Sequence, residues 1–169
     1  MIRPLAPSDL PRMAEIHVFG WRSAYRGIVP DEFLFNEMLV SKRIEFFEHV
    51  YFSENTENKM PSYVYDDGII KAFLTMGPCR DTDKPGAFEL WGIYVDPFFQ
   101  RQGIGSKLVE FCESEAAKLG YSEICLWVFD ENGAARKFYE KHDFRPDGAY
   151  DYSERFAAKK MRYVKCDIR

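Results

Sequence analysis

The stretch from residue 87 to residue 128 constrains the fold most, because it predicts a strand, a helix and a second strand in close succession. Ala87 to Val95 is strand-like and stops at Asp96-Pro97. Ile104 to Lys118 carries apolar residues at helical spacing and closes at Gly120. Ile124 to Val128 is apolar throughout, which predicts a buried strand. The stretch therefore predicts one β-α-β unit.

The segments on either side predict further helices and a hairpin. Asp67-Gly68 is a tight-turn pair between two strand-like runs, and the polar run Ser53–Lys59 predicts a loop. The other expected elements are strands at Ile2–Leu5, Ser62–Tyr65, Ile69–Met76, near Phe144 and near Lys160–Val164, and helices capped by Ser8-Asp9, opened by Pro30, capped by Ser41, and at Asn132–Lys141. This mixture predicts an α+β (α/β-like) fold with a mixed, mostly antiparallel sheet flanked by helices.

Length and charge limit the domain count and the partners. A chain of 169 residues fits one domain and can bury a core without disulfides or metal. It contains no internal repeat, low-complexity tract or linker, so residues 1–169 are expected to form a single domain. The net charge of −4 argues against nucleic acid as a partner, because phosphate binding needs a basic surface.

The first residues and the cysteines bear on location and on metal binding. Met1-Ile2-Arg3-Pro4 does not resemble a signal peptide, and no apolar run reaches the length of a membrane span. We therefore expect a cytoplasmic protein with reduced thiols and no membrane partner. Cys112 and Cys125 lie in apolar runs and are expected in the core. No C-x-x-C pair or zinc-like Cys/His spacing occurs, so no metal is expected; the four cysteines are Cys79, Cys112, Cys125 and Cys166.

The junction between the first strand and the helix of the β-α-β unit carries two glycines, in Gln100-Arg101-Gln102-Gly103-Ile104-Gly105. Glycines lack a Cβ atom, so they let the backbone approach a ligand closely. The free N–H groups and the dipole at the start of a helix favour an anion, and Arg101 and Lys107 add positive charge. The spacing is neither that of a P-loop nor that of a dinucleotide-binding fingerprint. By itself the motif predicts either an anion-binding site or a loop whose two glycines serve only its backbone conformation.

Two neighbouring motifs extend this pattern. Tyr94-Val95-Asp96-Pro97 precedes the loop, and Asn132-Gly133-Ala134-Ala135-Arg136-Lys137-Phe138-Tyr139 follows the second strand. Together with the loop they closely resemble the GNAT superfamily of acyl-CoA N-acyltransferases, whose loop signature is Q/R-x-x-G-x-G/A. The resemblance covers residues 60–165 well and the N-terminal helices more loosely. It implies a GNAT fold with a sheet of about six to seven strands flanked by helices, and acetyl-CoA as the co-substrate.

The resemblance also implies which residues contact the cofactor. The loop amides would bind the CoA pyrophosphate, and the backbone of Ile93 and Val95 would pair with the pantetheine arm like an added strand. The implied cofactor-binding residues are Ile93, Tyr94, Val95, Gln100, Arg101, Gln102, Gly103, Ile104, Gly105, Ser106, Lys107, Asn132, Ala135 and Tyr139.

Glu89 is the candidate general base. Attack on a thioester needs an amine without its extra proton, and a lysine-like amine has a pKa of about 10.4, so a proton must be removed directly or through water. Glu89 is the only acid in its apolar strand, and family members that use a glutamate base place it at this point. The alternatives are that Glu89 faces solvent or pairs with a cation. Strand alternation puts Glu89, Trp91, Ile93 and Val95 on one face without deciding which face meets the cleft.

Tyr139 and Asn132 lie in the helix that follows the second strand. In the family, a tyrosine at this position reaches the CoA sulfur, so Tyr139 is the candidate acid for the leaving thiolate. The alternative is a core aromatic beside Phe138 and Phe144. Asn132 is a good N-cap for its helix, and the family also uses this asparagine to contact the cofactor. Both roles of Asn132 can hold together.

The acceptor would be expected near the first helices. The run from Trp21 to Pro30 resembles the W-x-x-x-Y-x-G-x-x-P segment of many bacterial small GNAT enzymes, whose first helices flank the acceptor groove. Trp21 and Tyr25 share a helix face and could form an aromatic wall, or they could pack the helix onto the sheet. We favour packing for Trp21 and leave Tyr25 open. Tyr150 lies in a polar-aromatic stretch that could close the other side of the groove, and Glu89 completes the candidate acceptor site.

These observations predict an acetyl-CoA-dependent N-acetyltransferase. It would transfer acetyl to a primary amine of a small molecule or a protein N-terminus, by direct attack in a ternary complex. The alternative is a non-catalytic module that binds acyl-CoA as a sensor, against which the intact Glu89, Asn132 and Tyr139 argue. The expected partners besides the acceptor include neither nucleic acid nor a membrane, and a homodimer is compatible with the sequence.

Overall fold

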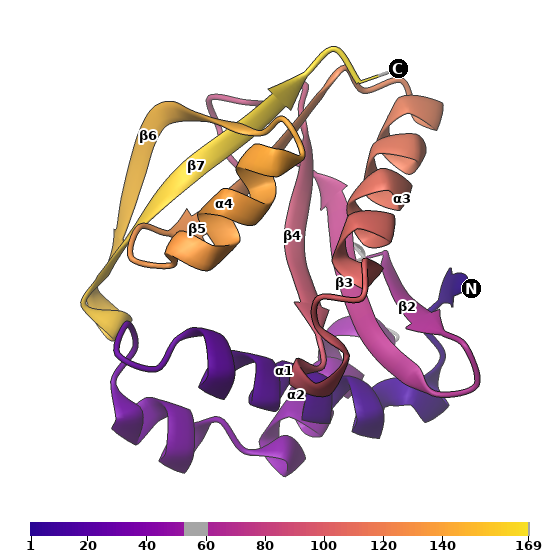
Figure 1. The fold of residues 1–169 in the computed structure, drawn as a ribbon, viewed down its shortest axis with the longest axis vertical. Helices are drawn as coiled ribbons and strands as arrows, with labels where there is room; N and C mark the ends of the chain where they lie inside the picture. Colours follow the sequence, from indigo (N-terminus) through magenta and orange to yellow (C-terminus); the bar gives the residue numbers. More distant parts are fainter. Residues whose placement is uncertain (53–60, 169) are drawn as a thin grey trace. The chain divides into compact units, whose positions relative to one another are not determined.

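The computed structural model describes residues 1–52 and 61–168, so the loop predicted at Ser53–Lys59 lies outside the described residues. Seven strands form one mixed sheet in the order β1-β2-β3-β4-β5-β7-β6 (Figure 1). β4 and β5 pair in parallel around the helix α3 (Ile104–Lys118), which confirms the predicted β-α-β unit and the α+β fold. The strands are β1 Ile2–Pro4, β2 Ser62–Asp66, β3 Ile70–Pro78, β4 Phe88–Val95, β5 Glu123–Phe129, β6 Arg145–Ser153 and β7 Ala158–Cys166.

The chain divides into two compact units, whose boundaries fall within β3, β4 and α3. Unit 1 comprises Met1–Thr75 and Ile93–Leu108, and unit 2 comprises Met76–Gly92 and Val109–Arg169. Two strands and a helix therefore run from one unit into the other. The expectation of a single domain over residues 1–169 stays a prediction.

Unit 1 holds the helices α1 (Leu10–Ala24) and α2 (Val40–Phe52), which pack against each other (Figure 1). Pro11 lies in the first turn of α1, where a missing N–H breaks no helical hydrogen bond. Apolar side chains of both helices are buried against β2 and β3. Each large apolar side chain buried in this way stabilises the fold by roughly 1.5–3 kcal/mol. The buried cluster is Leu10, Met13, Ala14, Ile16, Phe47, Tyr51, Val64 and Phe73.

Local details of the helix starts in unit 1 differ from the predictions. α2 begins at Val40, so the predicted cap at Ser41 is wrong. The preceding helix contains a π-helical turn at Phe33–Glu37, which periodicity does not predict. Asp9 occupies the N-cap of α1 without a capping bond from its side chain, because that carboxylate accepts hydrogen bonds from Arg3 at 2.6 and 3.0 Å.

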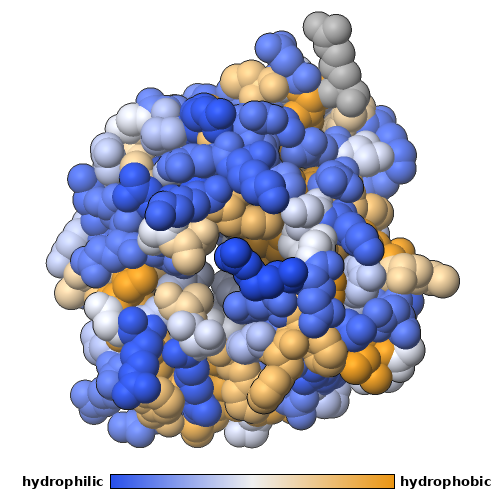
Figure 2. All heavy atoms as spheres, in the orientation of Figure 1, coloured by the Kyte–Doolittle hydropathy of each residue, from blue (hydrophilic) through white to orange (hydrophobic). Residues whose placement is uncertain are grey.

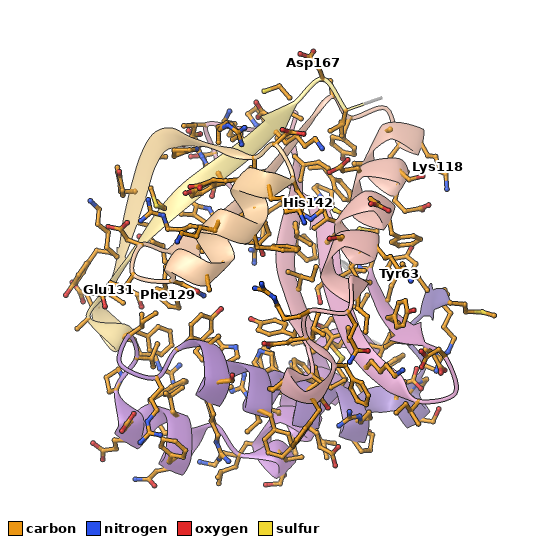
Figure 3. The ribbon with its side chains drawn as sticks, viewed as in Figure 1. Tyr63, Lys118, Phe129, Glu131, His142 and Asp167 are labelled. Carbon is orange, nitrogen blue, oxygen red and sulfur yellow. The ribbon has the colours of Figure 1, made fainter. Side chains whose placement is uncertain are left out.

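Unit 2 holds β5, β7 and β6 with the helix α4 (Gly133–Lys141). Tyr163 of β7 is fully buried and ties α4 to the sheet: its hydroxyl donates to Glu140 at 2.9 Å and accepts from Arg136 at 3.2 Å. Figure 3 labels Phe129 and Glu131, where β5 gives way to α4, and His142, where α4 ends. The two strands predicted at the end of the chain are thus β6 and β7.

The described part of the chain also tests the predictions about cysteines and membranes. Cys112 and Cys125 are buried, as predicted. Among the described residues, none of the helices combines the length and the apolar character needed to cross a bilayer. The face drawn in Figure 2 is largely hydrophilic, with separate hydrophobic patches.

Candidate active site

The predicted anion-binding loop lies in unit 1 after the end of β4. Asp96 caps a 3-10 turn at Pro97–Phe99, since its carboxylate accepts the N–H of Phe98 at 2.9 Å, and it also pairs with Arg12 of α1. Residues 100–103 then form a turn, and residues 104–107 are the first turn of α3. The loop therefore stands where the sequence predicts it, anchored to α1 by an ion pair.

The backbone of this loop leaves room for the predicted anion. Gly103 has a φ of 78° and Arg101 a φ of 64°, both in the left-handed region that glycine adopts most readily. A Cβ atom placed on Gly103 would meet no atom within 4 Å, so the space beside it is open. The first N–H groups of α3 have no partner inside the helix, and its dipole favours an anion. Arg101 and Lys107 are exposed cations beside these groups.

The aromatic residues of α1 gather with Tyr94, also in unit 1. Trp21 donates from Nε1 to the Tyr94 hydroxyl at 3.1 Å, and its ring lies 4.8 Å from that of Tyr25. Tyr94 also stacks on Phe73 at 5.1 Å, and Ile93 and Val95 beside it are half-buried. Trp21 thus packs within unit 1, while contact of Trp21 or Tyr25 with an acceptor stays a prediction.

Glu89 lies in the part of β4 that belongs to unit 2, and its carboxylate is held by four hydrogen bonds. Arg80 donates from Nη2 to Oε1 at 2.6 Å, from Nε to Oε2 at 3.0 Å and from its backbone N–H to Oε2 at 3.1 Å. Trp91 donates from Nε1 to Oε2 at 3.0 Å. The Glu89 side chain is only 2% exposed, whereas that of Arg80 is 56% exposed. The hydrogen bond to Glu89 raises the pKa of Arg80, so this guanidinium stays charged.

A glycine lets Trp91 take this position. A Cβ atom on Gly77 of β3 would lie 2.5 and 2.6 Å from two atoms of the Trp91 ring, so any larger residue would push the indole away. Arg80 covers the same indole, with Cζ 5.0 Å from the ring centroid. Both partners of Glu89 are therefore positioned by close packing within unit 2.

Within unit 2, Glu89 is also the last residue of β4 that pairs with the parallel strand β5. The two strands pair Phe88 with Ile124 and Glu89 with Cys125. Next to it is an open pocket of about 300 Å³, lined by Arg80, Asp81, Glu89, Trp127, Asp151 and Lys160. Two further carboxylates, two cations and one indole thus line this pocket together with the predicted base.

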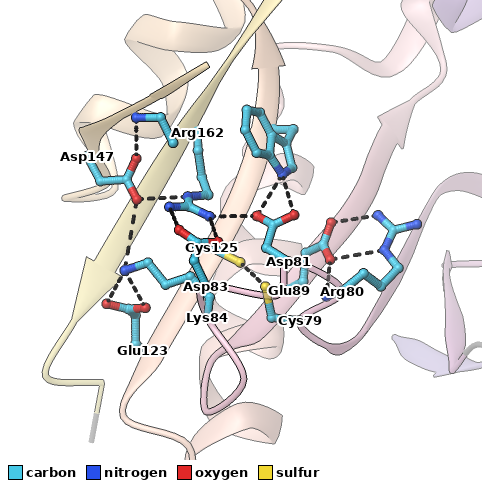
Figure 4. A network of polar contacts seen from close by, with 12 residues as sticks. Cys79, Arg80, Asp81, Asp83, Lys84, Glu89, Glu123, Cys125, Asp147 and Arg162 are labelled. Carbon is cyan, nitrogen blue, oxygen red and sulfur yellow. Dashed lines mark hydrogen bonds and ion pairs between the residues drawn. The ribbon is translucent and has the colours of Figure 1, made fainter. Parts of the chain in front are cut away.

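A network of ion pairs borders this pocket (Figure 4). Arg162 of β7 is 5% exposed and binds Asp81 at 2.9 Å, Asp83 at 2.6 Å and Asp147 at 2.8 Å. The hydrogen bond to Asp83, together with those to Asp81 and Asp147, raises the pKa of Arg162. Trp127 donates from Nε1 to Asp81 at 3.0 Å. Asp81 is therefore fixed in place by two donors.

The predicted cofactor residues on α4 belong to unit 2. Asn132 is the N-cap of α4, with Oδ1 accepting the N–H of Ala135 at 3.1 Å, which confirms its predicted capping role. Tyr139 is buried, and its ring lies 5.3 Å from Phe138 and 5.9 Å from Phe144. The predicted core contacts of Tyr139 are therefore present, and its role as an acid stays a prediction.

Tyr150 lies in β6, opposite Met161 of β7. Its side chain is 51% exposed, and Lys159 Nζ stands 3.6 Å from its ring centroid. Unit 2 therefore contains Glu89, Asn132, Tyr139 and Tyr150, whereas the loop, Trp21 and Tyr25 belong to unit 1.

The sequence matches the model of a known family. That family is described as the acetyltransferase (GNAT) family, and its model matches residues 21–144. The chain belongs to the GNAT family of acetyltransferases. A probable N-acetyltransferase of Mycobacterium tuberculosis is 30% identical over 148 residues, covering 87% of this chain and 80% of that protein. The uncharacterized N-acetyltransferase YuaI of Bacillus subtilis is 28% identical over 133 residues, covering 78% and 72%.

Solved GNAT structures share the fold. The PaiA N-acetyltransferase of Thermoplasma acidophilum, solved in complex with coenzyme A, is similar with a TM-score of 0.69 at 20% identity over 96% of each chain. A ribosomal-protein-alanine N-acetyltransferase of Brucella melitensis has a TM-score of 0.71 at 19% identity, covering 98% of this chain and 99% of that one. The predicted GNAT fold is confirmed, and so is the predicted class of enzyme, an acetyl-CoA-dependent N-acetyltransferase.

Sequence reasoning missed several residues around Glu89 in this GNAT enzyme. Arg80 and Asp81 lie in the connection after β3, and Trp127 lies on β5. Nothing in the local sequence singles out Arg80 as the partner of a residue nine positions later. Trp91 carried a usable signal, since it shares a strand face with Glu89.

Proposed function

We propose that this GNAT enzyme acetylates a primary amine, on a small molecule or a protein N-terminus, by direct attack in a ternary complex with acetyl-CoA. Acetyl-CoA supplies the acetyl group as a thioester. The observation that carries the proposal is the buried carboxylate of Glu89 at an open pocket with Asp81, Asp151 and Trp127. The lining holds three carboxylates against two cations, and this excess of negative charge together with the indole suits an amine, which arrives as a cation.

Glu89 would accept the proton that the amine must lose, directly or through water. Its ion pair with Arg80 supports this role, because the half-exposed Arg80 side chain can leave while the buried carboxylate cannot. An incoming ammonium group can replace the guanidinium, so that the carboxylate keeps a cationic partner throughout. We therefore propose that Arg80 holds the Glu89 carboxylate in place until the acceptor binds.

The remaining proposed roles concern the cofactor and the leaving group. The amides at Gln102–Gly105 would bind the pyrophosphate, with Arg101 and Lys107 adding charge. Among the described residues of unit 2, the pairing of β4 with β5 ends at Glu89, so residues 90–92 do not pair with β5. This supports pairing of the strand with the pantetheine arm. Tyr139 would donate a proton to the thiolate, and Asn132 would contact the cofactor from the start of α4.

A screen for thiol release tests the activity and its alternative. Acetyl-CoA should raise the melting temperature, because it binds the folded state. A library of polyamines, amino acids, aminoglycosides and short peptides with free N-termini should contain acceptors that release the CoA thiol above background. A sensor module would show the thermal shift and release no thiol with any amine. The absence of a shift at millimolar acetyl-CoA would contradict cofactor binding.

Glu89→Gln tests the base. We expect turnover to fall by roughly 100-fold or more, as for loss of a general base, while the thermal shift with acetyl-CoA persists. Glu131→Gln is the matched control, since Glu131 is an exposed glutamate of the same unit, and it should retain turnover. Equal turnover of Glu89→Gln and the wild type would remove Glu89 from the mechanism and leave the cofactor site intact.

A further inference from the structure

Two thiols and a carboxylate meet in unit 2, close to the ion pair of Glu89 (Figure 4). Cys79 and Cys125 are 46 residues apart in sequence, yet their Sγ atoms lie 3.0 Å apart. One ligand atom of Asp81 and the two sulfurs all lie within 4.8 Å of one another. Thiolates with a carboxylate are a ligand set that Zn²⁺ takes in proteins.

We propose that Cys79, Asp81 and Cys125 bind a thiophilic divalent cation of the Zn²⁺ class. Each thiol gives its proton to solvent as its sulfur donates an electron pair, so two protons leave for each dication bound. Three protein ligands leave the fourth tetrahedral position to water. The proposal departs from the expectation of no metal, which rested on spacing along the sequence.

The carboxylate of Asp81 is already oriented by groups that are not ligands. Oδ2 accepts from Trp127 Nε1 at 3.0 Å and from Arg162 at 2.9 Å, while among the described residues Oδ1 has only the longer contact to Trp127 at 3.3 Å. Oδ1 therefore keeps a lone pair for a cation. Such outer hydrogen bonds fix the geometry of a metal ligand and strengthen its binding.

The position of β4 favours a bridging cation over a direct disulfide. The Cys79 N–H donates to the carbonyl of Ala87, the residue before β4, at 2.9 Å, and Cys125 of β5 pairs with Glu89 of β4. β4 therefore lies between the two backbones, and the sulfurs are 3.0 Å apart, which is about 1 Å more than the roughly 2.05 Å of a disulfide bond. A cation adds length, because two sulfurs on tetrahedral zinc are about 3.8 Å apart.

A cation can reach the two sulfurs from solvent. Cys79 is partly exposed and Asp81 lines the open pocket, whereas Cys125 is buried. The sulfurs need to separate by less than about 1 Å, which the Cys79 side chain can accommodate by rotation. A bound cation would hold the residues on both sides of Arg80, the partner of Glu89. The site itself does not depend on acetyl transfer.

Titration with Co²⁺ tests the site on the full-length, untagged protein, reduced with a phosphine and stripped of metal. We expect thiolate-to-cobalt charge-transfer absorption that saturates at one Co²⁺ per chain and disappears when Zn²⁺ is added. Zn²⁺ should also raise the melting temperature. The absence of charge-transfer absorption at equimolar Co²⁺ would overturn the proposal.

Variants locate the ligands. Cys79→Ser should abolish the absorption, and Asp81→Asn should weaken Co²⁺ binding by at least about tenfold. Cys166→Ser and Cys112→Ala are the matched controls, one exposed and one buried, and should keep it. Absorption that persists in Cys79→Ser, or that is lost in Cys166→Ser, would contradict the assignment.

Alkylation of the wild-type protein gives a second measurement that does not depend on variants. Zn²⁺ should protect Cys79 from iodoacetamide, as read by peptide mass spectrometry, while Cys166 is labelled equally with and without the ion. Equal labelling of Cys79 under both conditions would overturn the proposal even if Cys79→Ser failed to fold.

Discussion

Unit 1 and unit 2 accommodate their polar groups in different ways. Around α1, unit 1 buries the imidazole of His17 among the rings of Trp21, Phe73 and Tyr94, at centroid distances of 5.6, 6.1 and 4.7 Å. Unit 2 instead surrounds the buried Arg162 with three carboxylates. In unit 1 the groups proposed to meet the cofactor are backbone amides. In unit 2 the groups proposed to meet the acceptor are side chains that are fixed by ion pairs with other side chains.

The two sites should therefore respond differently to amino-acid substitutions. A site made of amides depends on a few backbone angles, such as the φ of 78° at Gly103, and changes little when nearby side chains change. A site made of ion pairs depends on every partner, since removing one leaves another charged group without compensation. Substitutions in unit 2 should therefore have the larger effects on stability.

Arg162→Met is expected to have the largest effect. The side chain keeps a similar length, but Asp81, Asp83 and Asp147 lose their shared cation. Breaking a buried pair costs about 3–5 kcal/mol, and we expect the lower end because Asp83 is 63% exposed. The free energy of unfolding in urea measures the loss.

Lys118→Met is the control for Arg162→Met. Lys118 pairs with Glu115 on the surface of α3, and its side chain is 66% exposed (Figure 3). A surface pair of this kind contributes less than about 1 kcal/mol. Equal losses for the two variants would show that the network around Arg162 contributes no more than a surface ion pair.

The sequence predicts the backbone parts of the fold better than the side-chain networks. The β4-α3-β5 unit and the loop between Gln100 and Gly105 follow from periodicity and from two glycines, which act over a few residues. The π-helical turn at Phe33–Glu37 and the start of α2 at Val40 were missed, because neither has a distinct local pattern.

The partners of Glu89 show why side chains are harder to predict. Arg80 reaches Glu89 through the connection between β3 and β4, and Cys79 meets Cys125 across β4. Such meetings depend on strand order and on the path of a connection, which a single sequence does not specify. The sequence therefore predicted Glu89 as the candidate base and named pairing with a cation as an alternative. The structure shows such a pair, with Arg80.

His17 is expected to make unit 1 sensitive to acid. Burial, together with the charge of Arg43, lowers the pKa of His17 from 6.5 to about 3, and Nδ1 has no hydrogen-bond partner among the described residues. The unfolded chain therefore binds more protons than the folded one between these two values, so stability falls as the pH drops below 6.5. We expect a loss of roughly 2 kcal/mol between pH 6.5 and pH 4.5 from this residue.

Urea unfolding at both pH values, in His17→Phe and in the wild type, isolates this contribution. The variant removes the titrating ring from an aromatic cluster, so its stability should fall less with acid by about that amount. His49→Gln is the control, because His49 is exposed on α2, and it should keep the slope of the wild type. Equal slopes for His17→Phe and the wild type would mean that His17 does not set the acid sensitivity.

Gly103→Ala tests the backbone site of unit 1. The space beside Gly103 is open, so the methyl group meets no atom. The φ of 78° is nevertheless unfavourable for alanine, and we expect a loss of about 1–2 kcal/mol in the free energy of unfolding. A weaker thermal shift with acetyl-CoA should accompany it if the loop relaxes to another conformation.

Gly133→Ala is the counterpart in unit 2 and has the smallest expected effect. Gly133 is the first residue of α4, lacks a positive φ and also has open space beside it. Alanine fits such a position and restricts the unfolded chain, so we expect stabilisation by about 0.4–1 kcal/mol. The two substitutions add the same methyl group into open space, and opposite signs would assign the difference to φ alone. A loss at Gly133 as large as that at Gly103 would mean that both helix starts need glycine for a reason other than φ.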